Sequence, residues 1–170
     1  QAALSWDTIA RIKTNYDIPV VLKGLGSTED AAIAVDHGVD GIVVSNHGGR
    51  QLDHGGGSLE RLPSILEGVS GKIPVYVDGG FCRGTDIVKA MALGATGVGI
   101  GRLYCYALAA AGSDGVVRML EILENEINSA LGLLGVCRLD QLNHSHLAHP
   151  LPVVNDLGVL SAFPLLDLKP

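Results

Sequence analysis

The chain has 170 residues, of which 47% are hydrophobic and 18% charged, and its formal net charge is −6. This composition predicts one domain with its own core and excludes a disordered chain, and the negative charge argues against nucleic acid or an anionic membrane as the main partner. No apolar run has the length of a membrane span, and residues 1–15 do not have the pattern of a secretory signal. Three cysteines without a C-x-x-C pair predict reduced thiols and a cytoplasmic location.

The predicted elements alternate between helix and strand along the chain. A helical pattern from Ser5 to Tyr16 leads into the first strand, and each short apolar strand is followed by a helix. We predict strands at about 19–23, 41–45, 74–78 and 97–101, and connecting helices that begin at Thr28, Ser58 and Gly84 and end near Gly38, Gly68 and Gly94. Near-continuously apolar strands separated by helices indicate parallel pairing and burial on both faces.

The chain contains an internal repeat. Segment 18–24 resembles 73–79 with an offset of 55 residues, and segment 38–44 resembles 94–100 with an offset of 56. Repeated strand–helix units favour a (β/α)8 barrel, and the fingerprint of a Rossmann sheet, G-x-G-x-x-G after the first strand, is absent. A barrel needs eight strands and the chain supplies four after a leading helix. We therefore predict an α/β fold that forms the second half of a TIM barrel, with the first half missing or on another chain.

The region after the last strand is predicted to complete the domain without contributing chemistry. A short helix is expected at about 104–111 and a longer one at about 114–134, which has one apolar face and packs outside the barrel. Residues 150–170 contain four prolines and are predicted to form an extended tail, so the domain covers residues 1–149. The two open sheet edges of a half barrel predict association with another chain, and we expect a homo-oligomer.

Polar residues stand at the end of every predicted strand, where (β/α)8 enzymes carry their active sites. Arg50 offers a planar fork for a carboxylate, and the ammonium of Lys23 suits a developing negative charge. Glycines in segments 79–85 and 99–102 precede helices and are typical of phosphate-binding loops. Structural alternatives are a solvated Lys23 or an Asp78 that pairs with Lys23 or Arg102. The strand ends and the loops after them carry Lys23, Ser45, His47, Arg50, Asp78, Gly79, Gly80, Gly101 and Arg102.

Residues 45–53, SNHGGRQLD, resemble the signature of the FMN-dependent α-hydroxy acid oxidases and dehydrogenases, which include glycolate oxidase, lactate oxidase and mandelate dehydrogenase. Segments 21–24, 78–80, 83–86 and 101–102 match that family in order and rough spacing, and the resemblance covers about residues 4–147. It implies a (β/α)8 barrel with FMN at its mouth. It also implies oxidation of a small L-2-hydroxy acid, of the lactate, glycolate or mandelate type, to the 2-keto acid, with reoxidation by oxygen or another acceptor.

The resemblance also implies residue roles. His47 matches the active-site base, Arg50 the arginine that holds the substrate carboxylate, and Lys23 a catalytic lysine beside the flavin. Cys82 departs from the family, which often has a second arginine there, so Arg102 and backbone amides bind the phosphate or Arg83 reaches in. The remaining expected FMN contacts are Ser45, Asp78, Gly79, Gly80, Arg83, Gly101 and Arg102.

The sequence is also compatible with other functions. The runner-up enzyme is another FMN-binding or phosphate-binding barrel, and a non-enzymatic alternative is a half barrel that binds phosphate ligands or assembles with itself. We expect no metal site, although His144, His146 and His149 could form one. The expected partners are a small 2-hydroxy acid and the N-terminal half of the same barrel. The residues do not distinguish hydride transfer from a carbanion route, oxidase from dehydrogenase or monooxygenase, or one substrate side chain from another.

Overall fold

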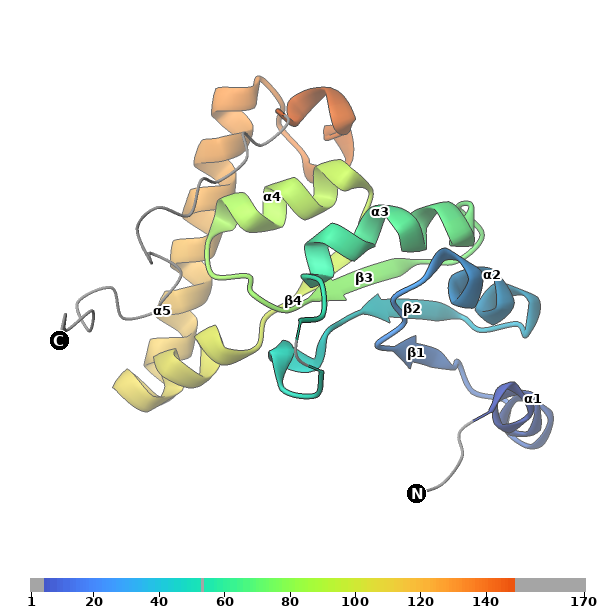
Figure 1. The fold of residues 1–170 in the computed structure, drawn as a ribbon. Helices are drawn as coiled ribbons and strands as arrows, with labels where there is room; N and C mark the ends of the chain where they lie inside the picture. Colours follow the sequence, from blue (N-terminus) through green and yellow to red (C-terminus); the bar gives the residue numbers. More distant parts are fainter. Residues whose placement is uncertain (1–4, 53, 149–170) are drawn as a thin grey trace, which may run out of the picture.

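A computed structural model describes residues 5–52 and 54–148 and contains a four-stranded sheet flanked by helices (Figure 1). The α/β class is confirmed, and the predicted tail at 150–170 lies outside the described residues. The strands are β1 (Val21–Lys23), β2 (Gly41–Val44), β3 (Val75–Asp78) and β4 (Gly97–Gly99). The helices are α1 (Trp6–Asn15), α2 (Thr28–Asp36), α3 (Ser58–Val69), α4 (Gly84–Leu93) and α5 (Arg102–Leu134), and the short 3₁₀ turns are η1 (His47–Gly49), η2 (Leu139–Gln141) and η3 (His144–His146).

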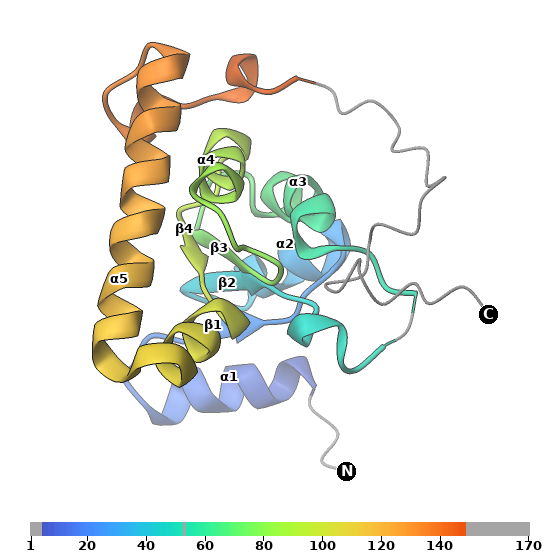
Figure 2. The same cartoon turned by 90° about the vertical axis from the view of Figure 1, so that its left-hand side faces the viewer.

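The sheet has the order β1-β2-β3-β4, and each strand pairs in parallel with the next. Helices α2, α3 and α4 connect the strands and lie side by side over one face of the sheet, as Figures 1 and 2 show from two directions. This repeated strand–helix arrangement is the one from which (β/α)8 barrels are built. It brings the C-terminal ends of all four strands to the same edge of the sheet.

The two faces of the sheet differ in burial, contrary to the prediction that both are covered. Ile42 and Val77 are fully buried beneath the helices, whereas Tyr76 is 39% exposed and Val21 is 49% exposed on the other face. In a complete barrel, side chains from other strands fill the interior and cover this second face. The strands are apolar on both faces, as barrel strands are, but the described residues cover only one of these faces.

Helix boundaries agree with the predicted starts and stops to within two residues. The hydroxyl of Ser27 caps α2 by accepting a hydrogen bond from Asp30 N at 3.1 Å, and Gly94 ends α4 in the left-handed region. Helix α3 ends one residue beyond Gly68, at Val69, so Gly68 lies inside the helix. A Cβ at Gly68 would lie 2.3 Å from the carbonyl oxygen of Thr28, so this glycine allows α2 and α3 to pack closely.

Helix α5 joins the two helices predicted after the last strand. Its backbone leaves helical geometry at Ala111 and at Gly112, whose φ is 60° and ψ −144°, so the predicted break is confirmed within one continuous element. The first part begins at Arg102, two residues before the predicted start, and the long second part packs against α4 (Figure 2). In the part of the chain that the structure describes, every helix is too short or too polar to span a lipid bilayer.

Candidate active site

The carboxyl ends of the strands open into a cavity of about 330 Å³. All of the site residues predicted from the sequence line it, except Ser45 and Arg83. The sequence did not single out Gly48, Phe81 or Leu103, which lie beside predicted residues and complete the wall. The full lining consists of Lys23, His47, Gly48, Arg50, Asp78, Gly79, Gly80, Phe81, Cys82, Gly101, Arg102 and Leu103.

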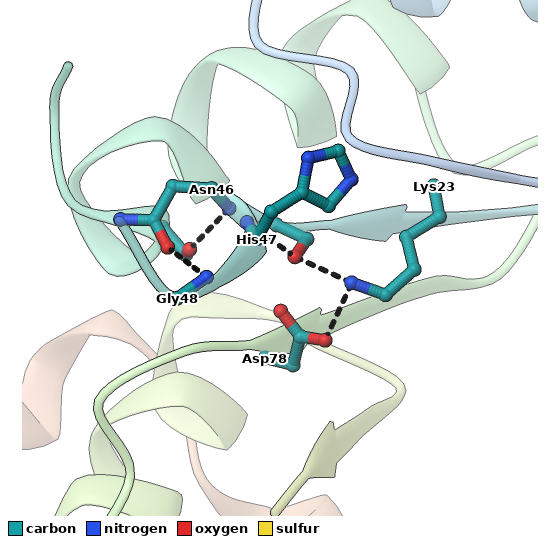
Figure 3. Close-up of polar contacts among 7 residues, drawn as sticks. Lys23, Asn46, His47, Gly48 and Asp78 are labelled. Atoms are coloured by element: carbon teal, nitrogen blue, oxygen red, sulfur yellow. Dashed lines mark hydrogen bonds and ion pairs between the residues drawn. The ribbon is translucent and has the colours of Figure 1, made fainter. Parts of the chain in front are cut away.

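Lys23 is held between the ends of two neighbouring strands (Figure 3). Its Nζ lies 2.7 Å from Oδ2 of Asp78 and donates a hydrogen bond to the hydroxyl oxygen of Ser45 at 2.5 Å. Of the two partners that the sequence left open for Asp78, the structure therefore gives Lys23. Because about half of the Lys23 side chain is exposed, solvent screens this ion pair and its worth for stability is small. Its main consequence is to hold one ammonium group at a defined place in the cavity wall.

Ser45 lies behind the cavity wall and connects Lys23 to the loop that carries His47. The Ser45 side chain is buried, and its hydroxyl oxygen also accepts a hydrogen bond from His47 N at 3.1 Å. Asn46 fixes the same turn, because its Oδ1 accepts from Gly48 N and its own N–H donates to the hydroxyl of Ser58, both at 3.1 Å (Figure 3). The loop is thus tied to β1 and to the first residue of α3.

His47 adopts a backbone conformation that is costly for a residue with a side chain. Its φ is 54°, in the left-handed region, and such conformations persist where the surrounding contacts enforce them, often at functional sites. Gly24 gives the imidazole room, since a Cβ there would lie 3.1 Å from Nε2 and Cε1 of His47. Neither ring nitrogen bonds to a residue within 5–52 or 54–148. The imidazole is therefore positioned by the backbone and free to act on a bound molecule.

The opposite end of the cavity has the features of a phosphate site. Gly79 and Gly80 both have positive φ, 100° and 87°, and Cβ atoms built at Gly80 and Gly101 would enter open space. Helix α5 begins at Arg102, so its first N–H groups lack intrahelical acceptors and its positive end faces this region. No carboxylate of the described residues pairs with Arg102. Glycine backbone, a helix N-terminus and an unpaired guanidinium together fit a phosphate group.

Arg83 lies apart from the other predicted cofactor contacts. Its Nη2 is 2.6 Å from Oε1 of Glu126, and its Nε donates to the same oxygen at 2.8 Å. The hydrogen bond to Glu126 raises the pKa of Arg83, and the same bond lowers the pKa of Glu126. Arg83 is not part of the cavity wall, so the geometry favours Arg102 and backbone amides for a phosphate rather than an Arg83 that reaches in.

The histidines that the sequence left open as an alternative metal site are described only in part. His144 and His146 lie in η3, beyond α5, and His149 falls outside the described residues. Across residues 5–52 and 54–148, no three His, Cys, Asp or Glu side chains come together in a way that could hold a metal ion.

The sequence profile of the FMN-dependent dehydrogenase family matches residues 1–149. The chain belongs to this family, whose members are FMN-dependent oxidoreductases. It is 51% identical over 134 residues to 4-hydroxymandelate oxidase of Amycolatopsis orientalis, a match that spans 79% of this chain and 38% of the relative. It is 43% identical over 146 residues to glycolate oxidase of Spinacia oleracea, across 86% of this chain and 40% of the relative.

Solved structures agree with the fold and with the cofactor of the family. A mandelate oxidase variant with a monooxide FMN adduct matches with a TM-score of 0.77 and 48% identity, over 81% of this chain and 44% of that one. The four parallel strands are thus part of the barrel fold of these enzymes. The chain spans about 40% of the length of the curated relatives that it matches.

Proposed function

We propose that the chain supplies the substrate-oxidising and phosphate-binding side of an FMN-dependent barrel that converts a small L-2-hydroxy acid to the 2-keto acid. The observation that carries this proposal is the placement of His47, Arg50 and Lys23 around one cavity, at the carboxyl ends of β1 and β2. A base, a carboxylate-binding fork and a fixed cation are the three groups that oxidation of a 2-hydroxy acid needs. Relatives named glycolate oxidase, lactate oxidase and hydroxymandelate oxidase support the same reaction class.

Arg50 and His47 have different roles toward the substrate: Arg50 binds it and His47 accepts a proton from it. The guanidinium of Arg50 binds the carboxylate through two parallel hydrogen bonds, which fixes the orientation of the hydroxyl and the α-hydrogen. His47 then accepts a proton from the substrate as a general base, the role that histidine fills most often in enzymes. Both side chains are exposed to the cavity, so a molecule of this size reaches them.

The residues at the other side of the cavity suit FMN, which accepts two electrons from the substrate when it is bound. Lys23 supplies a positive charge that stabilises negative charge developing in the cavity, and Asp78 and Ser45 keep its ammonium in place. Arg102 and the first N–H groups of α5 hold the phosphate, with Gly80 and Gly101 leaving room for it.

The exposed face of the sheet supports the proposal that this chain works within a complete barrel. Tyr76 and Val21 need apolar cover, and the interior of a (β/α)8 barrel provides it from the other four strands. We therefore place the activity in a complete barrel, in which this chain works with a first half such as the one its relatives contain. The proposed homo-oligomer and cytoplasmic location stay predictions.

A colour and bleaching experiment tests the function. The chain is joined to the N-terminal barrel half of a relative, purified, and titrated anaerobically with lactate, glycolate and mandelate. Yellow protein that loses its absorbance with at least one of these acids, and not with the matching amides, supports the proposal. Colourless protein that also fails to take up added FMN overturns it and favours the non-enzymatic half barrel.

Replacing Cys82 with arginine is expected to tighten FMN binding about fivefold at low salt, because it adds a cation close to a phosphate. Cys82 is exposed and lines the same cavity as Arg102, and Arg83 is paired with Glu126, so Arg102 is the guanidinium that the described residues offer a phosphate at this end. Fluorescence titration with FMN measures the change, and the gain should shrink as salt is raised. Cys137→Arg, at an exposed cysteine outside this cavity, is the matched control. Equal affinities for both variants would show that Cys82 lies too far from the phosphate.

A further inference from the structure

Glu126 is the residue of α5 that makes the densest set of polar contacts with the segment before α4. Its Oε1 accepts from Nε of Arg83 at 2.8 Å and lies 2.6 Å from Nη2 of the same residue. Its Oε2 accepts from the backbone N–H of Gly84 at 2.7 Å. Both oxygens are thus engaged, and the Glu126 side chain is only 23% exposed. Two nitrogens of Arg83 share one oxygen of Glu126 and the N–H of Gly84 takes the other, so three contacts fix this carboxylate more strictly than a single surface ion pair would.

The backbone around Gly84 packs directly on α5 at this point. A Cβ at Gly84 would lie 2.5 Å from Cβ of Glu126 and 2.8 Å from the carbonyl oxygen of Leu123. Asp86 ties down the preceding residues, because its Oδ2 accepts from Cys82 N at 3.2 Å and from Arg83 N at 3.0 Å. The C-terminal end of segment 79–84 is therefore anchored by Asp86 from α4 and by Glu126 from α5.

The anchored segment is also part of the cavity wall. Gly79, Gly80, Phe81 and Cys82 line the phosphate end of the cavity, opposite the first turn of α5. Cys82 and Leu103 in addition share a neighbouring apolar groove with Met119 and Leu123 of the long part of α5. The long part of α5 therefore adjoins both walls between which the phosphate is proposed to bind.

We propose that Glu126 is a positioning residue for the phosphate end of the cofactor site, although it is not part of the cavity wall. Because Glu126 binds Arg83 and Gly84, it fixes the position of segment Gly79–Cys82 relative to the N-terminus of α5. This inference rests on the proposed FMN function. In this proposal Arg83 binds Glu126 and not the phosphate. Loss of Glu126 should therefore weaken binding of the phosphate group and leave binding of the flavin ring unchanged.

Comparison of FMN with riboflavin, which lacks the phosphate, tests this role. In the completed barrel, Glu126→Ala should weaken FMN binding about tenfold and leave riboflavin binding unchanged, as measured by flavin fluorescence. Glu126→Gln keeps an oxygen that can accept from Gly84 N, so it should recover part of the loss. In the flavin-free protein, amide hydrogen exchange at 79–84 should be faster in Glu126→Ala than in the unsubstituted protein.

Glu121→Ala is the control on the same helix, since Glu121 is exposed and pairs with Arg118. It should change neither flavin affinity nor exchange at 79–84. Equal losses of FMN and riboflavin binding in Glu126→Ala would overturn the proposal by showing general damage, and unchanged FMN binding would overturn it as well. If the unsubstituted protein binds riboflavin and FMN equally, or binds neither, the result contradicts the proposed FMN function itself. Such a result is distinct from a failure of the role proposed for Glu126.

Discussion

Replacement of His47 by alanine is expected to lower turnover of the completed enzyme by at least about 10³-fold while FMN stays bound. Among the described residues that line the cavity, the imidazole is the side chain best suited to act as a general base, because Asp78 pairs with Lys23 at 2.7 Å. Alanine, like histidine, carries a Cβ, so the substitution does not add the backbone freedom that glycine would bring at the left-handed φ of 54°. The substitution therefore removes the base and not the cavity.

Stopped-flow reduction under anaerobic conditions measures this effect directly, since it follows the flavin absorbance before any acceptor is involved. His144→Ala is the matched control, because His144 is exposed in η3, outside the cavity wall. If the flavin in His47→Ala is reduced by the substrate at a rate within tenfold of the unsubstituted protein, His47 is not the general base. Loss of flavin in the variant would instead point to a structural role in the loop.

The fold could be predicted largely from local signals because the repeated units carry them. Each strand lies in a short run that contains valine or isoleucine, and glycines at 38 and 94 with positive φ follow α2 and α4. Two features depend on packing between elements that are distant in sequence. Gly68 has the residue type of a helix stop, yet its main role is the close contact with Thr28, and the exposure of Tyr76 and Val21 on one face of the sheet could not be read from the apolar strands.

The candidate site followed from one rule, that parallel strands deliver their C-terminal residues to one edge. This rule placed Lys23, His47 and Asp78 in the same cavity wall, as the structure has them. It could not place Arg83, because its partner Glu126 lies 43 residues later on α5 and no sequence pattern links the two. It also could not reveal the left-handed backbone of His47, whose N–H donates to the hydroxyl of Ser45 and whose ring lies close to Gly24.

Changing Arg50 to lysine is expected to lower kcat/KM for the hydroxy acid by about 10- to 100-fold, because a point charge cannot replace two parallel hydrogen bonds. Arg50 ends the η1 turn with ordinary αR dihedrals and lines the cavity, so lysine is accommodated by the backbone without strain. Loss of orientation affects kcat as well as KM, whereas loss of charge alone would affect mainly KM.

Steady-state kinetics of Arg50→Lys beside Arg50→Met separate these two contributions. Lysine should retain the preference for the acid over its amide, and methionine should abolish it, because only the cation favours a carboxylate. Arg118→Lys is the matched control, since Arg118 pairs with Glu121 on the exposed side of α5 and should keep normal kinetics. If Arg50→Lys also keeps normal kinetics, the substrate carboxylate is bound elsewhere, and Arg102, the other guanidinium in the cavity wall, becomes the residue to substitute next.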